Sequence, residues 1–413
     1  MKKATGFISA LLGLLMVASF QNAQAQIFKK IKDEVKNRTE RKVISKVGNA
    51  TDNAIDKVTE GGKEEQSDVP ETNENSSTNK AGKNKLPSMN NYKSYDFVPG
   101  DKIIFEPDLS SEPDAELPAR FTIRSGNAEI QSYNGEKILH LQADGDATVE
   151  PLMNSGNYLP EQFTLEFDMM YENDASYFKY VNDFEVQFRK PDDNNYKNWP
   201  LFRFVIENNS RSIFGNQSAG SQAFQEALSK SVNAGNVWHH IAIYVRKNIG
   251  KAYIDQYRVV ATNTLPTGAG KFAIKADRYG IKIKNLRLAA GGDDKYNKIV
   301  TDGKFITHGI LFDVNKSTIK PESMGTLNEI AKLMKEHNDL RFEIDGHTDS
   351  DGKADANMKL SQERADAVKA KLVEIGIDES RLTTKGFGAT KPIDKNDSAE
   401  GKANNRRVEF VKI

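Results

Sequence analysis

The spacing of apolar residues changes along this chain, and that change constrains its architecture more than any other feature. Between residues 95 and 292 apolar and polar residues alternate, as they do through residues 163–169. A period of two is typical of strands with one buried face. From residue 298 onward, short strand patterns alternate with helical ones. We therefore predict a multidomain chain, with an all-β sandwich at residues 95–292 followed by a two-layer α/β sandwich at residues 298–413.

The period-two region predicts a series of short strands separated by polar turns such as Asn134-Gly135. A membrane-spanning barrel would need strands of about 9 to 11 residues with a continuous apolar face. Several of the expected strands are shorter, and charges such as Glu185 and Arg246 interrupt them. We therefore expect a water-soluble sandwich with strands at residues 102–105, 137–142, 163–169, 184–188, 201–206, 241–245, 252–260, 272–275 and 281–288.

The last segment predicts the element order βαβαββ. A strand at residues 309–313 precedes a helix that begins at Pro321, and a strand at 341–346 precedes a second helix that ends at Gly376. The last two strands are expected at residues 381–387 and 407–411. The apolar face of the first helix consists of Met324, Leu327, Ile330, Ala331 and Met334.

The N-terminal residues have the features of an export signal. Lys2 and Lys3 precede an apolar run at residues 7–20, and Ala23-Gln24-Ala25 is a small-x-small cleavage site. We predict a signal peptide at residues 1–25 and a mature chain that begins at Gln26. Because the sequence has no cysteine, we expect neither a thioether-linked lipid at that residue nor any disulfide or thiolate metal site.

Two further segments precede the predicted sandwich. Apolar residues recur about every four positions through residues 26–60, which predicts an amphipathic helix that could contact an outer-membrane protein or a membrane surface. Residues 61–94 are mainly polar and have little to bury, so we expect a disordered, flexible linker.

Charge and motif content narrow the classes of function. Lysine plus arginine and aspartate plus glutamate both total 58, so no basic excess favours nucleic acid as a partner. The chain has no His-Glu-x-x-His, Gly-x-Ser-x-Gly or phosphate-binding loop. We expect a binding protein rather than an enzyme, with no catalytic residues, no cofactor and no metal site.

Three features of the central segment leave sharper interpretations open. Glu166, Asp168 and Glu172 share a strand face, but their spacing does not fit a glycosidase pair, and we expect solvated charges. The polar residues 192–195 could ligate calcium or bind a sugar, although a polar loop is the simpler interpretation. His239 and His240 lie on opposite faces of one strand, so they cannot chelate a metal together.

Residues 238–245, Trp-His-His-Ile-Ala-Ile-Tyr-Val, are followed by Lys251-Ala252-Tyr253-Ile254-Asp255. This strand pair resembles that of laminin-G-like, concanavalin-A-like jelly rolls. The resemblance implies a jelly-roll fold for the central domain, and many relatives bind sugars or calcium. Gln256 stands where the family usually has glycine, so we expect a longer or wider turn there. A carbohydrate-binding adhesin is therefore the alternative function, with a glycan held by the central domain.

The C-terminal segment has several spaced motifs in order. They are Phe312-Asp313, Ile319-Lys320-Pro321, Gly346-His347-Thr348-Asp349, Asn357, Leu360-Ser361, Arg364-Ala365, Gly386-Phe387-Gly388 and Asn405-Arg406-Arg407-Val408-Glu409. Together they resemble the OmpA-like peptidoglycan-binding domain. The resemblance implies non-covalent binding of peptidoglycan through the diaminopimelate of its stem peptide. It places the ammonium-binding aspartate at Asp349, the carboxylate-binding arginine at Arg364, and supporting residues at Asp313, Thr348, Asn357 and one of Arg406 or Arg407.

The chemistry of these two residues suits that ligand. Diaminopimelate ends in a zwitterion, which needs a hydrogen-bond acceptor and a fork-shaped donor side by side. Asp349 is such an acceptor, and Arg364 can donate two parallel bonds to a carboxylate. The alternative is a simple surface salt bridge between these two residues. The sequence therefore predicts an exported, outer-membrane-associated periplasmic protein of a Gram-negative bacterium that tethers the outer membrane, or its own sandwich domain, to the cell wall.

Overall fold

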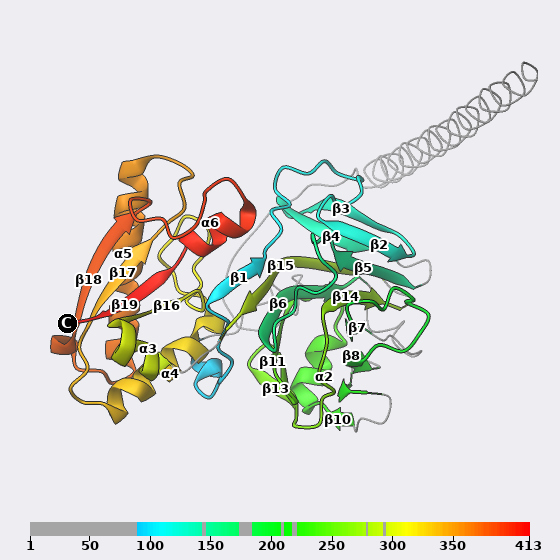
Figure 1. Ribbon diagram of the computed structural model, residues 1–413, viewed down its shortest axis with the longest axis horizontal. Helices are drawn as coiled ribbons and strands as arrows, with labels where there is room; N and C mark the ends of the chain where they lie inside the picture. The colour runs from blue at the N-terminus through cyan, green and yellow to red at the C-terminus, as the bar shows by residue number, and fades with distance from the viewer. Residues whose placement is uncertain are drawn as a thin grey trace, which may run out of the picture. The chain divides into compact units, whose positions relative to one another are not determined.

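The computed structural model describes residues 89–142, 146–172, 184–207, 210–216, 221–277, 280–291 and 295–413 (Figure 1). Residues Gly82–Ile413 form one compact unit. The expected signal peptide at 1–25, the amphipathic helix at 26–60 and the linker as far as residue 88 lie outside the described residues. The end of the expected linker is folded, because η1 (Met89–Tyr92) buries the ring of Tyr92.

Two antiparallel sheets form the central domain. In the described part of the chain, the first sheet has eight strands and the second has seven. The first sheet runs in the order β13 (Tyr257–Thr262), β12 (Ile249–Ile254), β11 (His239–Arg246), β6 (Gln162–Tyr171), β15 (Ile281–Ala290), β4 (Glu136–Leu141) and β3 (Ala128–Tyr133), with β1 (Lys102–Phe105) paired to β15. The second runs β10 (Ser221–Ala223), β9 (Arg211–Gly215), β8 (Phe202–Glu207), β7 (Phe184–Arg189), β14 (Lys271–Ala276), β5 (Ala147–Pro151) and β2 (Phe121–Ser125), and α2 (Glu226–Val232) lies between β10 and β11 in sequence.

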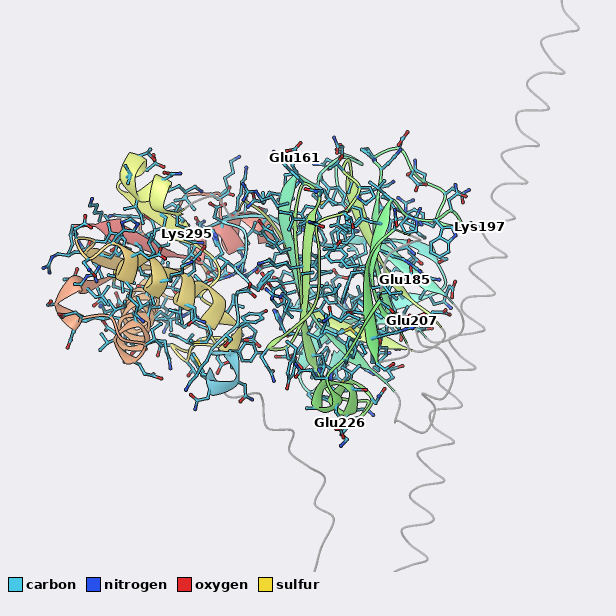
Figure 2. The ribbon with its side chains drawn as sticks, turned by 90° about the horizontal axis from the view of Figure 1, so that it is seen from below. Glu161, Glu185, Lys197, Glu207, Glu226 and Lys295 are labelled. Carbon is cyan, nitrogen blue, oxygen red and sulfur yellow. The ribbon has the colours of Figure 1, made fainter. Side chains whose placement is uncertain are left out.

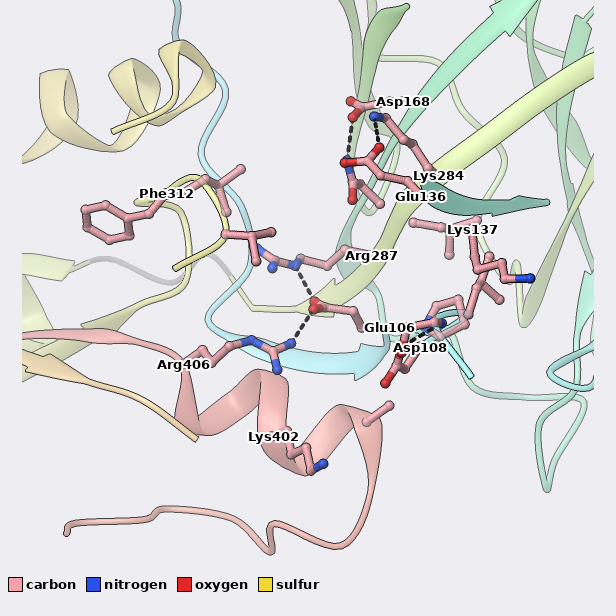
Figure 3. Close-up of a pocket in the computed structure, with 18 of the residues that line it drawn as sticks. Glu106, Asp108, Glu136, Lys137, Asp168, Lys284, Arg287, Phe312, Lys402 and Arg406 are labelled. Atoms are coloured by element: carbon pink, nitrogen blue, oxygen red, sulfur yellow. Dashed lines mark hydrogen bonds and ion pairs between the residues drawn. The ribbon is translucent and has the colours of Figure 1, made fainter. Parts of the chain in front are cut away.

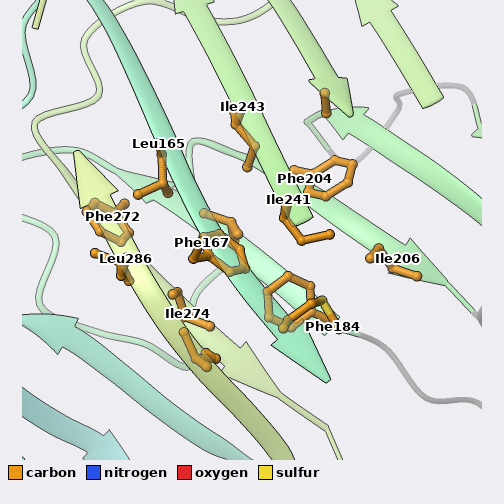
Figure 4. Close-up of a cluster of buried hydrophobic side chains, with 14 of the residues drawn as sticks. Leu165, Phe167, Phe184, Phe204, Ile206, Ile241, Ile243, Phe272, Ile274 and Leu286 are labelled. Carbon is orange, nitrogen blue, oxygen red and sulfur yellow. The ribbon is translucent and has the colours of Figure 1, made fainter. Parts of the chain in front are cut away.

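The core of this domain lies between the two sheets. Leu165 and Phe167 of β6 pack with residues such as Phe184, Phe204 and Ile274 of the second sheet (Figure 4). Figure 2 shows the sheets edge on, with Glu185 on the second sheet, away from the first. The alternation at residues 163–169 thus predicted the buried face correctly, and the antiparallel sandwich is confirmed.

One predicted strand and one predicted turn were wrong. Residues 252–260 form parts of two strands, because β12 and β13 pair as a hairpin in which Ile254 lies opposite Tyr257. The loop is only two residues long, Asp255 and Gln256, rather than longer or wider. Asp255 adopts a φ of 50°, and aspartate tolerates this left-handed conformation better than most residues do. Glycine is therefore not needed at Gln256.

The C-terminal domain combines a mixed sheet with helices. Its described sheet has four strands in the order β16 (Lys304–Thr307), β19 (Val408–Lys412), β17 (Phe342–His347) and β18 (Leu382–Gly388), of which β17 and β18 are parallel. The other elements are α3 (Lys295–Asp302), η2 (Pro321–Ser323), α4 (Met324–Glu336), α5 (Ala354–Glu374), η3 (Glu379–Arg381) and α6 (Ala399–Asn405). The predicted apolar face of α4 is buried throughout.

The first strand of this domain was predicted too late in the sequence. β16 occupies Lys304–Thr307, where the Phe305 ring stacks on Phe410 of β19 at 4.9 Å. Residues 309–313 are apolar enough to resemble a strand, but they run outside the sheet and contribute Ile310 to the core. A side chain at Gly309 would meet Thr326 Oγ1 at 2.2 Å, so this segment lies directly against α4.

The two domains share an extensive contact. Tyr95, Phe97 and Tyr253 of the N-terminal side pack with Leu327 and Ile330 of α4 in a single apolar cluster. Polar contacts add to it, since the Asn404 side chain bonds both the backbone N–H and the carbonyl of Ile103, at 2.9 and 3.3 Å. Among the described helices none is long and apolar enough to cross a membrane.

Candidate functional site

A cleft of about 810 Å³ opens between the sandwich and the C-terminal domain (Figure 3). Both domains contribute charged side chains to its lining. Six of the seven residues that the sequence singled out line it, and Arg407 is not among its lining residues. The six are Asp313, Thr348, Asp349, Asn357, Arg364 and Arg406.

Asp349 sits in a loop that begins where β17 ends. The loop is fixed at its start by the Thr348 N–H, which donates to the carbonyl of Gly388 at 3.0 Å. The Thr348 hydroxyl and the Asn357 amide both donate to the Asp349 carbonyl, at 2.8 and 3.3 Å. Asp349 Oδ1 accepts the N–H of Asp351 at 3.0 Å. Thr348 and Asn357 therefore hold the backbone that presents the Asp349 carboxylate.

Arg364 projects from α5 toward the same cleft. Its Nε donates to the Lys316 carbonyl at 3.0 Å, and its guanidinium lies over the Phe312 ring at 4.9 Å. Burial lowers the pKa of Arg364, and the positive charge of Arg406 lowers it further, while the Asp349 carboxylate acts in the opposite direction. One hydrogen bond from Nε leaves the terminal nitrogens of the fork available for a carboxylate.

Arg406 and Arg407 have different environments. Arg406 Nη1 donates to Asp349 Oδ2 at 2.8 Å, and its Nη2 donates to Glu106 Oε1 at 2.7 Å. Arg407 is buried and pairs with Glu409, whose Oε1 it reaches from Nη2 at 2.5 Å. Of these two candidates, Arg406 is the one beside Asp349.

Asp313 lies at the edge of the cleft, on the segment that precedes η2. Its carboxylate is 3.7 Å from the Lys316 ammonium, and its side chain is 41% exposed. This exposure leaves room for a ligand, and solvent weakens the ion pair.

The sandwich contributes residues that the sequence did not single out. Glu106 follows β1 directly, and its Oε2 accepts from Arg287 Nε at 2.6 Å. Burial raises the pKa of Glu106, but Arg287 and Arg406 outweigh burial and hold the pKa below its usual value. The sequence around Glu106 gives no signal that it lines a cleft, because its contacts with Arg287 and Arg406 depend on how the two domains dock.

The outer face of β6 is also part of the cleft. Glu166 and Asp168 were expected to be solvated, yet Glu166 is buried, and His240 Nδ1 lies 2.9 Å from Asp168. Burial lowers the pKa of His240, but the Asp168 and Glu166 carboxylates, at 2.9 and 3.6 Å from the ring nitrogens, outweigh burial and raise the pKa well above its usual value. The expectation failed because the C-terminal domain covers this face. His239 turns away and contacts Asp255 at 2.7 Å.

The loop at residues 192–195 is built around an internal cation. The buried Arg189 donates to Asp193 Oδ2 at 2.8 Å and to the carbonyls of Asn195 and Asn198. Asp193 Oδ2 and the Asn195 carbonyl, two of the oxygens that could have ligated calcium, therefore already accept hydrogen bonds from a guanidinium. Within the described ranges, no group of three or more acidic, histidine or cysteine residues is arranged to hold a metal ion.

Comparison with known proteins identifies relatives of the C-terminal domain. Residues 311–406 match the OmpA family. Probable lipoprotein YiaD of Escherichia coli (strain K12) is 45% identical over 104 residues, which are 25% of this chain and 48% of that protein. Outer membrane protein A of Bordetella avium is 47% identical over 100 residues, which are 24% of this chain and 52% of that protein.

A solved structure is similar over the same share of the chain. The crystal structure of the peptidoglycan-associated lipoprotein from Burkholderia pseudomallei is 27% identical and covers 25% of this chain and 88% of that one, with a TM-score of 0.24. The chain spans about half the length of the two curated relatives named above.

Proposed function

We propose that the C-terminal domain binds peptidoglycan non-covalently through the diaminopimelate residue of the stem peptide. Asp349 takes the ammonium of the zwitterionic end and Arg364 takes its carboxylate. The observation that carries this proposal is that both side chains line one cleft with opposite charges. Burial and Arg406 lower the pKa of Arg364, and the Asp349 carboxylate opposes part of that lowering, so the two charges interact electrostatically.

The supporting residues fit the same assignment. Thr348 and Asn357 hold the Asp349 loop through its carbonyl, and Asp313 supplies a further carboxylate at the rim. Arg406 fills the remaining supporting position, because it contacts Asp349 directly. These acidic and basic side chains complement the ammonium and the carboxylate of a zwitterionic ligand. We therefore expect binding rather than catalysis.

The match of residues 311–406 to the OmpA family supports a role at the cell envelope. The named relatives are an outer membrane protein and a lipoprotein. We infer that the chain works in the periplasm of a Gram-negative bacterium and tethers the outer membrane, or its own sandwich domain, to the cell wall. The jelly-roll assignment of the sandwich is part of this proposal, and the β11–β12 hairpin supports it.

The test is calorimetric titration of the full chain with a soluble stem peptide that contains diaminopimelate. Asp349→Asn and Arg364→Ala should each leave one ionic end of the ligand desolvated and unmatched, at a cost of about 2 to 5 kcal/mol, or roughly 30- to 5000-fold in affinity. Arg364→Lys should also bind weakly, because a point charge lacks the fork geometry.

A lysine-containing stem peptide is the matched ligand control. Its third residue has the ammonium but no adjacent carboxylate, so it should bind poorly to the wild-type chain. Wild-type affinity in a folded Arg364→Ala variant would show that the diaminopimelate site lies elsewhere.

A further inference from the structure

The cleft has a second wall, which the sandwich provides. Its volume of about 810 Å³ lies in the range of roughly 300 to 1,000 Å³ that is typical of sites for drug-sized ligands. A zwitterionic end group of one amino acid would fill only part of this space. The rest is bounded by sandwich residues that include Glu106, Lys284 and Arg287.

Glu106 connects this wall to the proposed ligand site through a relay of charges. Its Oε2 accepts from Arg287 at 2.6 Å, and its Oε1 accepts from Arg406 at 2.7 Å. The other arm of the Arg406 fork donates to Asp349 at 2.8 Å. The guanidinium of Arg406 is thus divided between a carboxylate of the sandwich and the carboxylate that would receive the ligand's ammonium.

The joint between the domains sets the position of this relay. Glu106 is the residue directly after β1, and Arg406 is the residue directly after α6. These two elements are bonded to each other, since Asn404 of α6 holds both backbone polar groups of Ile103 in β1. Ala403 and Ile103 also pack together in a small buried cluster. Docking of the sandwich therefore places Glu106 beside Arg406.

We propose that Glu106 is a positioning residue of this site, so that the sandwich sets the affinity of the C-terminal domain for the stem peptide. This inference rests on the proposed function. Arg406 and the ligand's ammonium compete for the negative charge of Asp349. Glu106 takes one arm of Arg406 and so limits that competition. Without Glu106, Arg406 pairs with Asp349 alone, and the ammonium binds less well.

The experiment compares full-length variants by calorimetric titration with the diaminopimelate stem peptide. Glu106→Gln keeps the size of the side chain and should weaken binding about three- to five-fold, the upper part of the range expected for a partly exposed ion pair. Glu400→Gln is the matched control. Glu400 pairs with Arg120 at 2.6 Å between the same two domains, but it is not among the residues that line the cleft. The affinity of the Glu400→Gln variant for the stem peptide should therefore stay within about two-fold of wild type.

A double-mutant cycle separates positioning from a general loss of structure. In an Arg406→Ala background, Glu106→Gln should have no further effect on affinity, because the competing cation is absent. If Glu106→Gln unfolds because Arg287 loses its partner, Glu106→Asp replaces it, because this variant keeps a negative charge near Arg287. Glu106→Asp should show a smaller loss of affinity, and that loss should also vanish in the Arg406→Ala background.

The outcomes distinguish this inference from the function on which it rests. If the wild-type chain does not bind the stem peptide, both are wrong. If the wild-type chain binds and folded Glu106→Gln binds equally well, the proposed function stands and the positioning role is wrong. A loss that persists unchanged in the Arg406→Ala background would also overturn it.

Discussion

Arg406 and Arg407 differ most clearly in exposure: the side chain of Arg406 is 39% exposed at the cleft, and that of Arg407 is 2% exposed. We predict that Arg407→Gln lowers the free energy of unfolding by about 3 kcal/mol, because it leaves the buried Glu409 with a weaker set of partners. Lys304 still reaches Glu409 at 2.6 Å, which limits the loss. Urea denaturation of the full chain measures it.

Arg406→Gln is the control for that substitution. Its ion pairs lie at the edge of the cleft, so its effect on stability should stay within about 1 kcal/mol. Equal losses of stability in the two variants would contradict the assignment of Arg407 to the fold and Arg406 to the site.

His308 makes stability depend on pH at the domain joint. Burial lowers the pKa of His308 to about 4, with a further contribution from Arg287, against the opposing bond from Nε2 to the Asn404 carbonyl. Because the folded pKa lies below the ordinary value of 6.5, the unfolded chain binds the proton first. This contribution to stability is complete above about pH 6.5 and is lost as the pH falls toward 4.

We predict that wild type loses about 2 to 3 kcal/mol more stability than His308→Gln between pH 7 and pH 4. Asp345, whose pKa burial raises to about 6 with help from Glu343, has the opposite dependence on pH, but it is present in both chains and cancels in the comparison. Urea denaturation at several pH values measures the difference. Parallel pH profiles would mean that His308 is protonated equally in both states.

At this scale the resemblance of the spaced motifs to the OmpA-like domain was the informative signal. It singled out Asp349, Thr348, Asn357 and Arg364 as candidate binding residues, and all four line one cleft. It could not choose between Arg406 and Arg407, because that choice depends on where α6 ends. The sequence could not predict the role of Glu106, because the two arginine partners of this residue are 181 and 300 residues away in sequence.

At the scale of elements, patterns predicted strands and helices that bury one side against their own domain. The alternation in β6 and the apolar face of α4 are of this kind. The pattern failed at residues 309–313, where apolar side chains fill the core from outside the sheet. It also joined β12 and β13 into one strand, because Asp255 turns the chain without a glycine. Period alone does not distinguish these cases.

The outer face of the first sheet shows a related limit. Glu166 and Asp168 alternate with apolar residues as exposed charges should. Glu166 is buried and the side chain of Asp168 is only 20% exposed, because the other domain docks there, and Ala242 on the neighbouring strand joins the core cluster of the C-terminal domain. Pattern analysis of one domain cannot detect a surface that another domain covers.

At the scale of the whole molecule, the shared apolar cluster links the stabilities of the two domains. Tyr95 and Phe97 are buried between them, and the Tyr253 ring lies 5.3 Å from Tyr95 and 5.5 Å from Phe97. The backbone fits as closely, since a side chain at Gly325 would meet the Phe97 carbonyl oxygen at 1.8 Å. Separating the domains would expose these rings to water, which costs roughly 1.5 to 3 kcal/mol for each one.

We therefore predict that residues 89–413 unfold in one calorimetric transition, although they contain two cores. The double substitution Tyr95→Ala, Phe97→Ala should divide that transition into two, because each domain then melts at its own temperature. Phe188→Ala is the matched control: Phe188 lies only in the sandwich core, so its removal should cost about 3 to 5 kcal/mol and lower the melting temperature without dividing the transition. Two transitions in the wild-type chain, unchanged by the double substitution, would mean that the cluster does not couple the domains. The sandwich could then not impose the position of Glu106 on the cleft, so this measurement also tests the physical basis of the proposed relay.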